Sequence, residues 1–188
     1  MEVRPLQFPN FVVDMDNGVF HFRVLLDHTE EVFRDFEIKS SSSFEELHEA
    51  IVGAFGFSGQ EIASFYMSNE EWDKGEEITQ MDMGGLGEAG IKTMKDTLIS
   101  DMIFDKEDKL LYVYDFMRMW VFYVEVISIR EIDSSAEYPK VILSVGDAPD
   151  ESSKELIDSF PVDFNLDMEE FSGQGEGFEN IDDYDEIL

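Results

Sequence analysis

The sequence predicts an α+β domain in which a mixed β-sheet carries one main helix packed on a face. Several short segments alternate apolar and polar residues, which is typical of half-buried strands, whereas one window near residue 50 repeats its apolar residues at helical spacing. The length of 188 residues and the 17 phenylalanines are enough for one aromatic-rich core with appendages. The expected order is ββαβ-loop-ββ.

The first two elements are expected to form a β-hairpin. Residues 19–26 are rich in strand-forming residues, and residues 32–38 alternate so that one face carries Val32, Arg34, Phe36 and Ile38. Asn17-Gly18 favours a tight turn because both residues accept positive φ, which predicts a further hairpin with residues 11–13.

The main helix is predicted at residues 44–55. Ser43 and Glu46 form a capping box, in which the hydroxyl accepts a helix amide and the carboxylate reaches back to the cap. Gly56 follows at the position of a left-handed C-cap. The residues expected to pack on the sheet are Phe44, Leu47, Ile51 and Phe55.

Four further strands are expected, at residues 62–67, 109–116, 121–129 and 141–145. Residues 121–129 are nearly continuous in apolar side chains, which predicts a central strand, and residues 141–145 are expected at an edge. The glycine-rich stretch 73–95 is predicted as a long irregular loop. Residues 97–113 resemble the last turn-and-strand passage of ubiquitin-like β-grasp domains.

Acidity is the strongest compositional feature, with 44 Asp and Glu against 13 Lys and Arg and a formal net charge of -31. A field of this sign repels nucleic-acid phosphates and anionic lipid and attracts basic proteins. We therefore expect no direct nucleic-acid or membrane binding, and we expect any charge-selected partner to be a basic protein. Solubility alone would explain the same charge and is the simpler account.

Residues 150–188 hold 14 acids and one base, with a glycine-rich stretch before a final charge run. This composition predicts an acidic tail that is docked in part, over about 156–171, and otherwise disordered. Residues 1–149 are then the α+β domain. The candidate partner-binding residues lie in the charge run: Asp182, Asp183, Tyr184, Asp185 and Glu186.

The residue types that the chain lacks exclude several kinds of site. Without cysteine there is neither a disulfide framework nor a thiolate metal site, and three histidines in unrelated positions form no metal triad. No phosphate-binding glycine motif and no apolar window of about 18 residues is present. We expect no catalytic residues, no metal, no cofactor and no enzymatic activity, in a cytoplasmic protein.

His48 lies at the edge of the apolar helix face, where a packed histidine is favoured over a general base because a base needs a partner and a cleft. A ligand pocket between the helix and the 114–120 turn is the alternative. Its candidate residues are His48, Asp115, Arg118 and Trp120.

Three stretches resemble the plasmid pRiA-type ORF-three-like family. The first joins residues 22–26, Phe33-Arg34 and 43–57; the second is the aromatic segment from Leu110 to Trp120; the third joins 138–141 with 146–149. The resemblance spans residues 19–149. It implies the family's fold and an occurrence on plasmids and as a passenger of insertion elements, but no established activity or cofactor.

The chain departs from the family pattern at three places. The Gly-Asp that follows the aromatic strand in the family is Met117-Arg118 here, and the family's Trp before two Arg residues is Phe33, followed by one Arg only. The histidine often found after the helix is absent from residues 62–65. The resemblance therefore implies that a polar site of the broader family is degraded in this chain.

The leading hypothesis is a non-enzymatic protein-interaction or regulatory domain that binds a basic partner, with binding weakened by salt. Two alternatives stay open. One is an acidic nucleic-acid mimic that occupies the cleft of a DNA-binding protein, and the other is a degenerate enzyme or small-ligand-binding domain.

Overall fold

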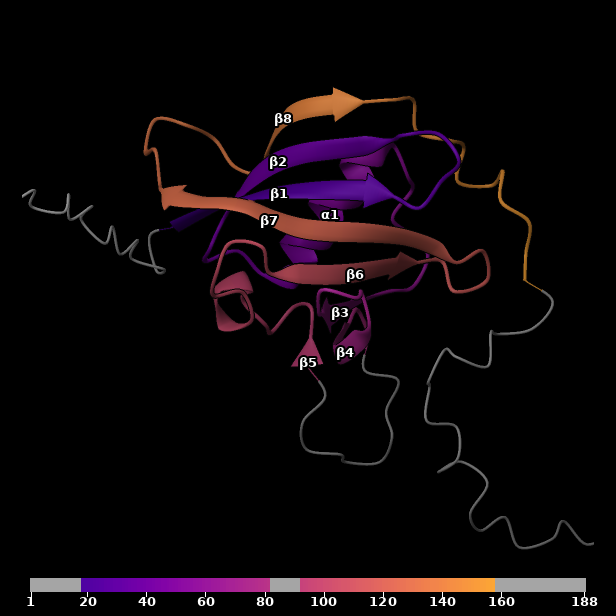
Figure 1. The fold of residues 1–188 in the computed structure, drawn as a ribbon, viewed down its shortest axis with the longest axis horizontal. Coiled ribbons are helices and arrows are strands. Elements are labelled where there is room, and N and C mark those ends of the chain that lie inside the picture. Colours follow the sequence, from indigo (N-terminus) through magenta and orange to yellow (C-terminus); the bar gives the residue numbers. More distant parts are fainter. Residues whose placement is uncertain (1–17, 82–91, 158–188) are drawn as a thin grey trace, which may run out of the picture. The chain divides into compact units, whose positions relative to one another are not determined.

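The computed structural model describes residues 18–81 and 92–157, which form one eight-stranded sheet with the helix α1 on one face (Figure 1). The sheet order is β5-β4-β3-β6-β7-β1-β2-β8. Neighbouring strands are antiparallel except β4 and β5, so the sheet is mixed and the α+β class is confirmed. The strands are β1 (Gly18–Leu26), β2 (Phe33–Lys39), β3 (Ala63–Ser68), β4 (Lys74–Thr79), β5 (Lys92–Thr93), β6 (Lys109–Tyr114), β7 (Trp120–Glu131) and β8 (Lys140–Val145).

β1 and β2 pair as an antiparallel hairpin in the expected place, with Phe22 opposite Phe36. The other edge of β1 pairs with β7 along its whole length. The additional hairpin expected with residues 11–13 lies outside the described residues. β7 has β6 and β1 as neighbours and lies inside the sheet, and β8 is an edge strand, both as expected.

The helix α1 (Phe44–Phe55) begins and ends where the sequence predicts. Both hydrogen bonds of the Ser43–Glu46 capping box are present, and Gly56 has a φ of 73°, the left-handed conformation that glycine adopts without steric cost. The four apolar residues expected on the inner face are all buried. Aromatic packing joins the helix to the sheet: the ring centroids of Phe55 and Phe122 are 4.9 Å apart.

The prediction of an irregular loop over residues 73–95 is wrong for β4 and β5, while residues 82–91 lie outside the described residues. β4 buries only Ile78, so its sequence has no alternating pattern, and its strand conformation comes from pairing with the edge of β3. Gly75 allows this approach, because a Cβ there would lie 2.9 Å from the Met67 carbonyl oxygen. The likeness to β-grasp domains stays a prediction.

A short 3-10 helix at Ile99–Asp101 precedes β6. β6 ends at Tyr114 rather than at residue 116, because residues 115–119 form a turn with positive φ at Asp115 and Met119.

Within residues 18–81 and 92–157, no helix has the length and apolar character that a membrane span requires.

Ordered contacts continue past residue 149, where the sequence places the start of the acidic tail. The indole nitrogen of Trp120 donates a hydrogen bond to the Glu151 carbonyl oxygen at 3.0 Å. The Ile157 amide donates to the Met117 carbonyl oxygen at 2.9 Å. Residues 150–157 are thereby attached to the β6–β7 turn. The partial docking expected over 156–171 is seen only at its beginning, because residues 158–188, with the acidic run at 182–186, lie outside the described residues.

Candidate functional site

His48 is a buried residue of α1, and its Nδ1 lies 2.7 Å from the Tyr112 hydroxyl oxygen. Its Nε2 lies 3.4 Å from the side-chain nitrogen of Gln80, whose side-chain oxygen accepts a hydrogen bond from the Ala63 amide at 3.1 Å. The Ala63 amide is a donor, so it orients the Gln80 oxygen toward itself and the Gln80 NH₂ group toward His48. We therefore assign the proton of neutral His48 to Nδ1, which donates it to Tyr112.

Burial lowers the pKa of His48 below its ordinary value of 6.5, so the ring is neutral at physiological pH. The ring is packed, as expected, but its main partner is the Tyr112 side chain rather than the backbone. An enclosed neutral imidazole of this kind is a structural hydrogen-bonding group, and it does not line the pocket that contains Trp120.

Asp115 and Arg118 are partners of each other. One carboxylate oxygen of Asp115 accepts hydrogen bonds from the Met117 and Arg118 amides at 3.0 and 3.1 Å, and the other accepts from the Arg118 guanidinium at 3.1 Å. Asp115 is buried, so these bonds satisfy a carboxylate that would otherwise be costly to enclose. The pair stabilises the β6–β7 turn and does not join His48 in one site.

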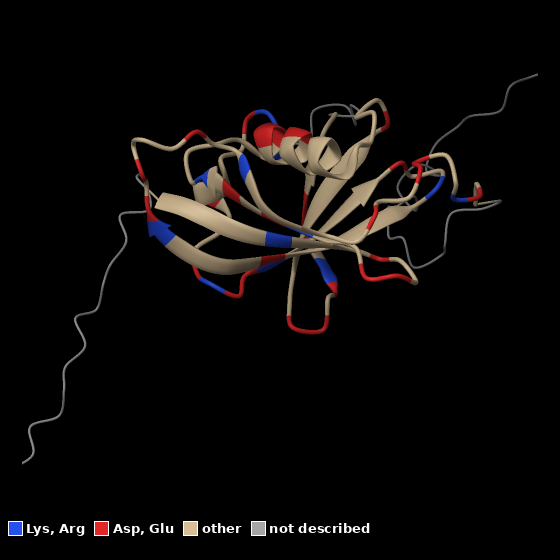
Figure 2. Ribbon diagram, turned by 90° about the horizontal axis from the view of Figure 1, so that it is seen from above, with Lys and Arg blue, Asp and Glu red and all other residues tan. Residues whose placement is uncertain are grey.

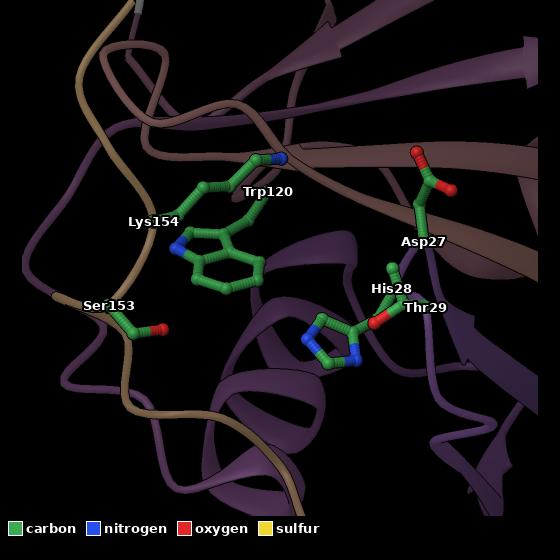
Figure 3. A pocket seen from close by; sticks show the side chains of 6 residues that line it. All are labelled: Asp27, His28, Thr29, Trp120, Ser153 and Lys154. Carbon is green, nitrogen blue, oxygen red and sulfur yellow. The ribbon is translucent and has the colours of Figure 1, made fainter.

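Trp120 is the predicted site residue that lines a substantial pocket, of about 500 Å³ (Figure 3). The pocket collects residues from the loop after β1, from the start of β7 and from the segment after residue 149. They are Asp27, His28, Thr29, Trp120, Ser153 and Lys154. Sequence reasoning missed five of the six, because only the folded chain brings these three segments together.

The pocket combines an indole surface with groups of both charges. The Lys154 ammonium donates to the Met119 carbonyl oxygen and lies 5.1 Å from the centroid of the Trp120 ring. Burial lowers the pKa of Lys154, although the carboxylate of Asp27 opposes this shift. His28 Nδ1 accepts a hydrogen bond from the Glu30 amide at 3.2 Å, so in the neutral ring Nε2 carries the proton and is a donor. These groups suit the binding of a small polar ligand.

The charged surface of the described residues is dominated by carboxylates, because acids outnumber bases and ion pairs occupy many of the bases. Arg23, Lys92, Lys106, Lys109, Arg118 and Arg130 each have an acidic partner. α1 contains three glutamates and neither lysine nor arginine (Figure 2). Glu46 closes the capping box, whereas Glu45 and Glu49 are exposed and have no cationic partner among the described residues.

Fold and sites together define a small, strongly acidic α+β domain in which one helix covers a face of an eight-stranded mixed sheet. The family model of plasmid pRiA4b ORF-3-like proteins matches residues 18–157. The chain therefore belongs to the plasmid pRiA4b ORF-3-like family, which confirms the resemblance carried by its motifs.

The fold is also similar to the crystal structure of a protein of unknown function, MM3350, from Methanosarcina mazei Go1. The TM-score is 0.61 and the sequence identity 23%, over 73% of this chain and 75% of that one. At this identity the likeness concerns the fold alone. No curated protein matches the chain.

Proposed function

We propose that this protein is a non-enzymatic, cytoplasmic interaction domain that binds a basic partner protein. The observation that carries the proposal is the distribution of charge. The cations in ion pairs are neutralised locally, while α1 presents Glu45 and Glu49 to solvent without a cationic partner among the described residues. Such a surface attracts a cationic protein over a distance of about 10 Å at 0.1 M salt.

Affinity capture from a lysate of the source organism tests this function. The full chain is immobilised, the salt concentration is raised in steps, and the released proteins are identified by mass spectrometry. We expect basic proteins that leave the column at moderate salt, because screening weakens attraction between exposed charges. Retention of neutral or acidic proteins, or retention that salt does not change, would contradict the proposal.

A matched variant shows whether α1 takes part. Glu45→Gln with Glu49→Gln removes two charges and keeps the size of both side chains, whereas Glu46 is left intact because it caps the helix. We expect the captured proteins to elute from this double variant at lower salt. An unchanged elution profile would place the basic-partner contact elsewhere on the chain.

The Trp120 pocket favours a second candidate function, the binding of a small ligand that carries a flat ring and an anionic group. Lys154 supplies the cation and His28 a ring N–H donor, and Trp120, which is 2% exposed, supplies an apolar edge of the pocket wall. Benzoate is a suitable probe. Because the chain has two tryptophans, Trp72→Phe leaves Trp120 as the sole tryptophan, which is excited selectively over the six tyrosines at the red edge of the absorption band. Saturable quenching that Lys154→Met abolishes would support this function, and quenching without saturation would contradict it.

A further inference from the structure

β8 is an open edge of the sheet. It pairs with β2 on one side, and among the described residues no strand pairs with its other side. Its three central aliphatic side chains are exposed by 48, 42 and 44%: Val141, Ile142 and Leu143. An edge strand of this kind offers unpaired backbone groups to another extended chain, and proteins usually protect such edges with charges or prolines. Lys140, at its first position, is the one charged residue of β8, and the register of β8 with β2 shifts at Ile142, opposite Asp35 and Phe36.

A groove of about 220 Å³ runs between α1 and β8. Its largely apolar lining includes Phe36, Ala50, Gly53, Ala54, Pro139 and Val141. Arg34 fixes the two walls, because its guanidinium donates to the Ala54 carbonyl oxygen at 3.1 Å and to that of Val145 at 2.8 Å. The groove is therefore part of the folded domain and needs no rearrangement to accept a side chain.

Gly53 keeps this groove open. Glycine inside a helix lowers the stability of the helix relative to alanine. No close neighbour requires glycine at position 53, because a Cβ there would meet nothing within 4 Å. Its φ is not positive, so the backbone does not require glycine either. The space above Gly53 is empty on the exposed side of α1, next to Val141.

The charged residues beside the groove favour a basic partner segment over a second copy of this chain. Lys140 lines the β8 wall of the groove, and the carboxylate opposite it in the register, Glu37, is the ion-pair partner of Arg130. Arg34 is accompanied by Asp147. The α1 wall carries Glu49, which has no cationic partner among the described residues, and Glu45 lies one helical turn earlier, so these two glutamates outnumber Lys140. A second copy of this chain would itself carry a net charge of -31 and the same exposed glutamates of α1. Repulsion therefore disfavours self-association and favours a basic segment.

We propose that β8 accepts an extended segment of a partner protein as an additional strand. One apolar side chain of that segment fills the α1–β8 groove, and a lysine or arginine two residues away, on the same face of the strand, pairs with Glu49. The inference rests on the proposed function and adds the place and the conformation of binding.

Peptides that repeat Lys-Thr-Val-Thr carry lysine and valine on one face and serve as probes, with affinity measured by fluorescence anisotropy. Gly53→Gln fills the groove without adding charge, and Val141→Thr removes apolar surface from the groove wall while keeping the size of the side chain. We expect each to weaken binding about tenfold, the scale set by one buried aliphatic side chain. Gly53→Ala and Ile127→Thr, at an exposed residue of β7 outside the groove, are the matched controls and should change affinity by less than about twofold.

Hydrogen exchange identifies the mode of binding, because an added strand protects amides at the outer edge of β8. Protection there on addition of the valine peptide supports strand addition. Equal binding of a Lys-Thr-Ser-Thr repeat, unaffected by the variants, would overturn strand addition while leaving the basic-partner function intact. Preference for a Glu-Thr-Val-Thr repeat would overturn both. A β8-dependent dimer in sedimentation velocity would make a second copy the occupant and would also overturn the proposal.

Discussion

His48 acquires its properties from residues far away in the chain. Its helix position is readable from the sequence, but Tyr112 and Gln80, which determine its tautomer, come from β6 and from the end of β4. Trp120 is similar, since the Asp27–Thr29 loop and Lys154 join it only in the folded chain. The sequence could therefore nominate single site residues but not their neighbours. The grouping of His48, Asp115 and Arg118 in one pocket is an inference from the predicted turn; in the structure Asp115 and Arg118 pair with each other, whereas His48 has Tyr112 and Gln80 as its partners.

Replacing His48 by Gln should change how stability depends on pH. Burial holds the pKa of His48 below 6.5 in the folded state, so below pH 6.5 the unfolded chain binds a proton that the folded chain excludes. Stability from this group is therefore lost as the pH falls from 6.5 toward the folded pKa. We expect the difference in unfolding free energy, wild type minus variant, to rise with pH over that window and to stay constant above it.

Urea denaturation of both proteins across this pH range measures the difference, and the many carboxylates cancel because both chains share them. A difference that stays constant through pH 6.5 would mean that His48 is not enclosed as described.

Asp35 has the opposite pH dependence. Burial alone would raise the pKa of Asp35, but two hydrogen bonds of 2.8 Å from Arg23, together with its charge, lower it below 3.8. The stabilisation is present above pH 3.8 and is lost as the pH falls through the folded pKa. Asp35→Asn should destabilise the protein at neutral pH by about 1–3 kcal/mol, because Arg23 keeps its charge and loses its partner.

Guanidinium denaturation at neutral pH and near pH 3 would measure this loss and its decline in acid. Glu37→Gln, on the same strand as Asp35, removes the partner of Arg130 and provides a comparison with a carboxylate that is 12% exposed, against 5% for Asp35. An Asp35→Asn variant as stable as the wild type would show that the Arg23–Asp35 pair contributes nothing to folding.

Elements with a strong local pattern were predictable from the sequence. α1 has a capping box, a helical apolar repeat and a glycine C-cap, and all three are realised between Ser43 and Gly56. β1, β2 and β7 likewise carry enough apolar residues to identify them. β4 and β5 do not, because their strand conformation depends on the edge of β3. Non-local pairing of this kind leaves no periodic signal in a sequence.

The packing of α1 on the sheet gives a prediction at this scale. Leu47 is fully buried in the cluster between α1 and the sheet, so Leu47→Ala should cost about 2–5 kcal/mol, the sum of lost burial and a residual cavity. Thermal unfolding followed by far-UV circular dichroism would report the loss as a lower Tm. Leu98→Ala, at a residue that is 40% exposed, is the control and should shift the Tm little. Similar Tm changes for the two variants would mean that the inner face of α1 is wrongly assigned.

At the scale of the whole molecule, charge opposes compactness. Even if all 13 Lys and Arg were paired with carboxylates, 31 of the 44 acids would remain without a cationic partner. Repulsion among them destabilises the compact state, because folding brings like charges closer together. The sequence alone was sufficient to establish this property, since net charge does not depend on the fold.

Added salt should therefore stabilise this protein. Screening shortens the reach of repulsion from about 30 Å at 0.01 M ionic strength to about 8 Å at 0.15 M. Salt also weakens the exposed ion pairs, such as Lys106–Glu107 and Lys92–Glu76, but pairs of this kind contribute at most about 1 kcal/mol each and are outnumbered by unpaired acids. We expect the Tm of the full chain at neutral pH to rise when sodium chloride raises the ionic strength from the lower to the higher of these values. The Glu45→Gln, Glu49→Gln double variant should rise less, because it has less repulsion to screen. A Tm that falls with added salt would mean that ion pairs, rather than excess negative charge, govern the electrostatic stability of this fold.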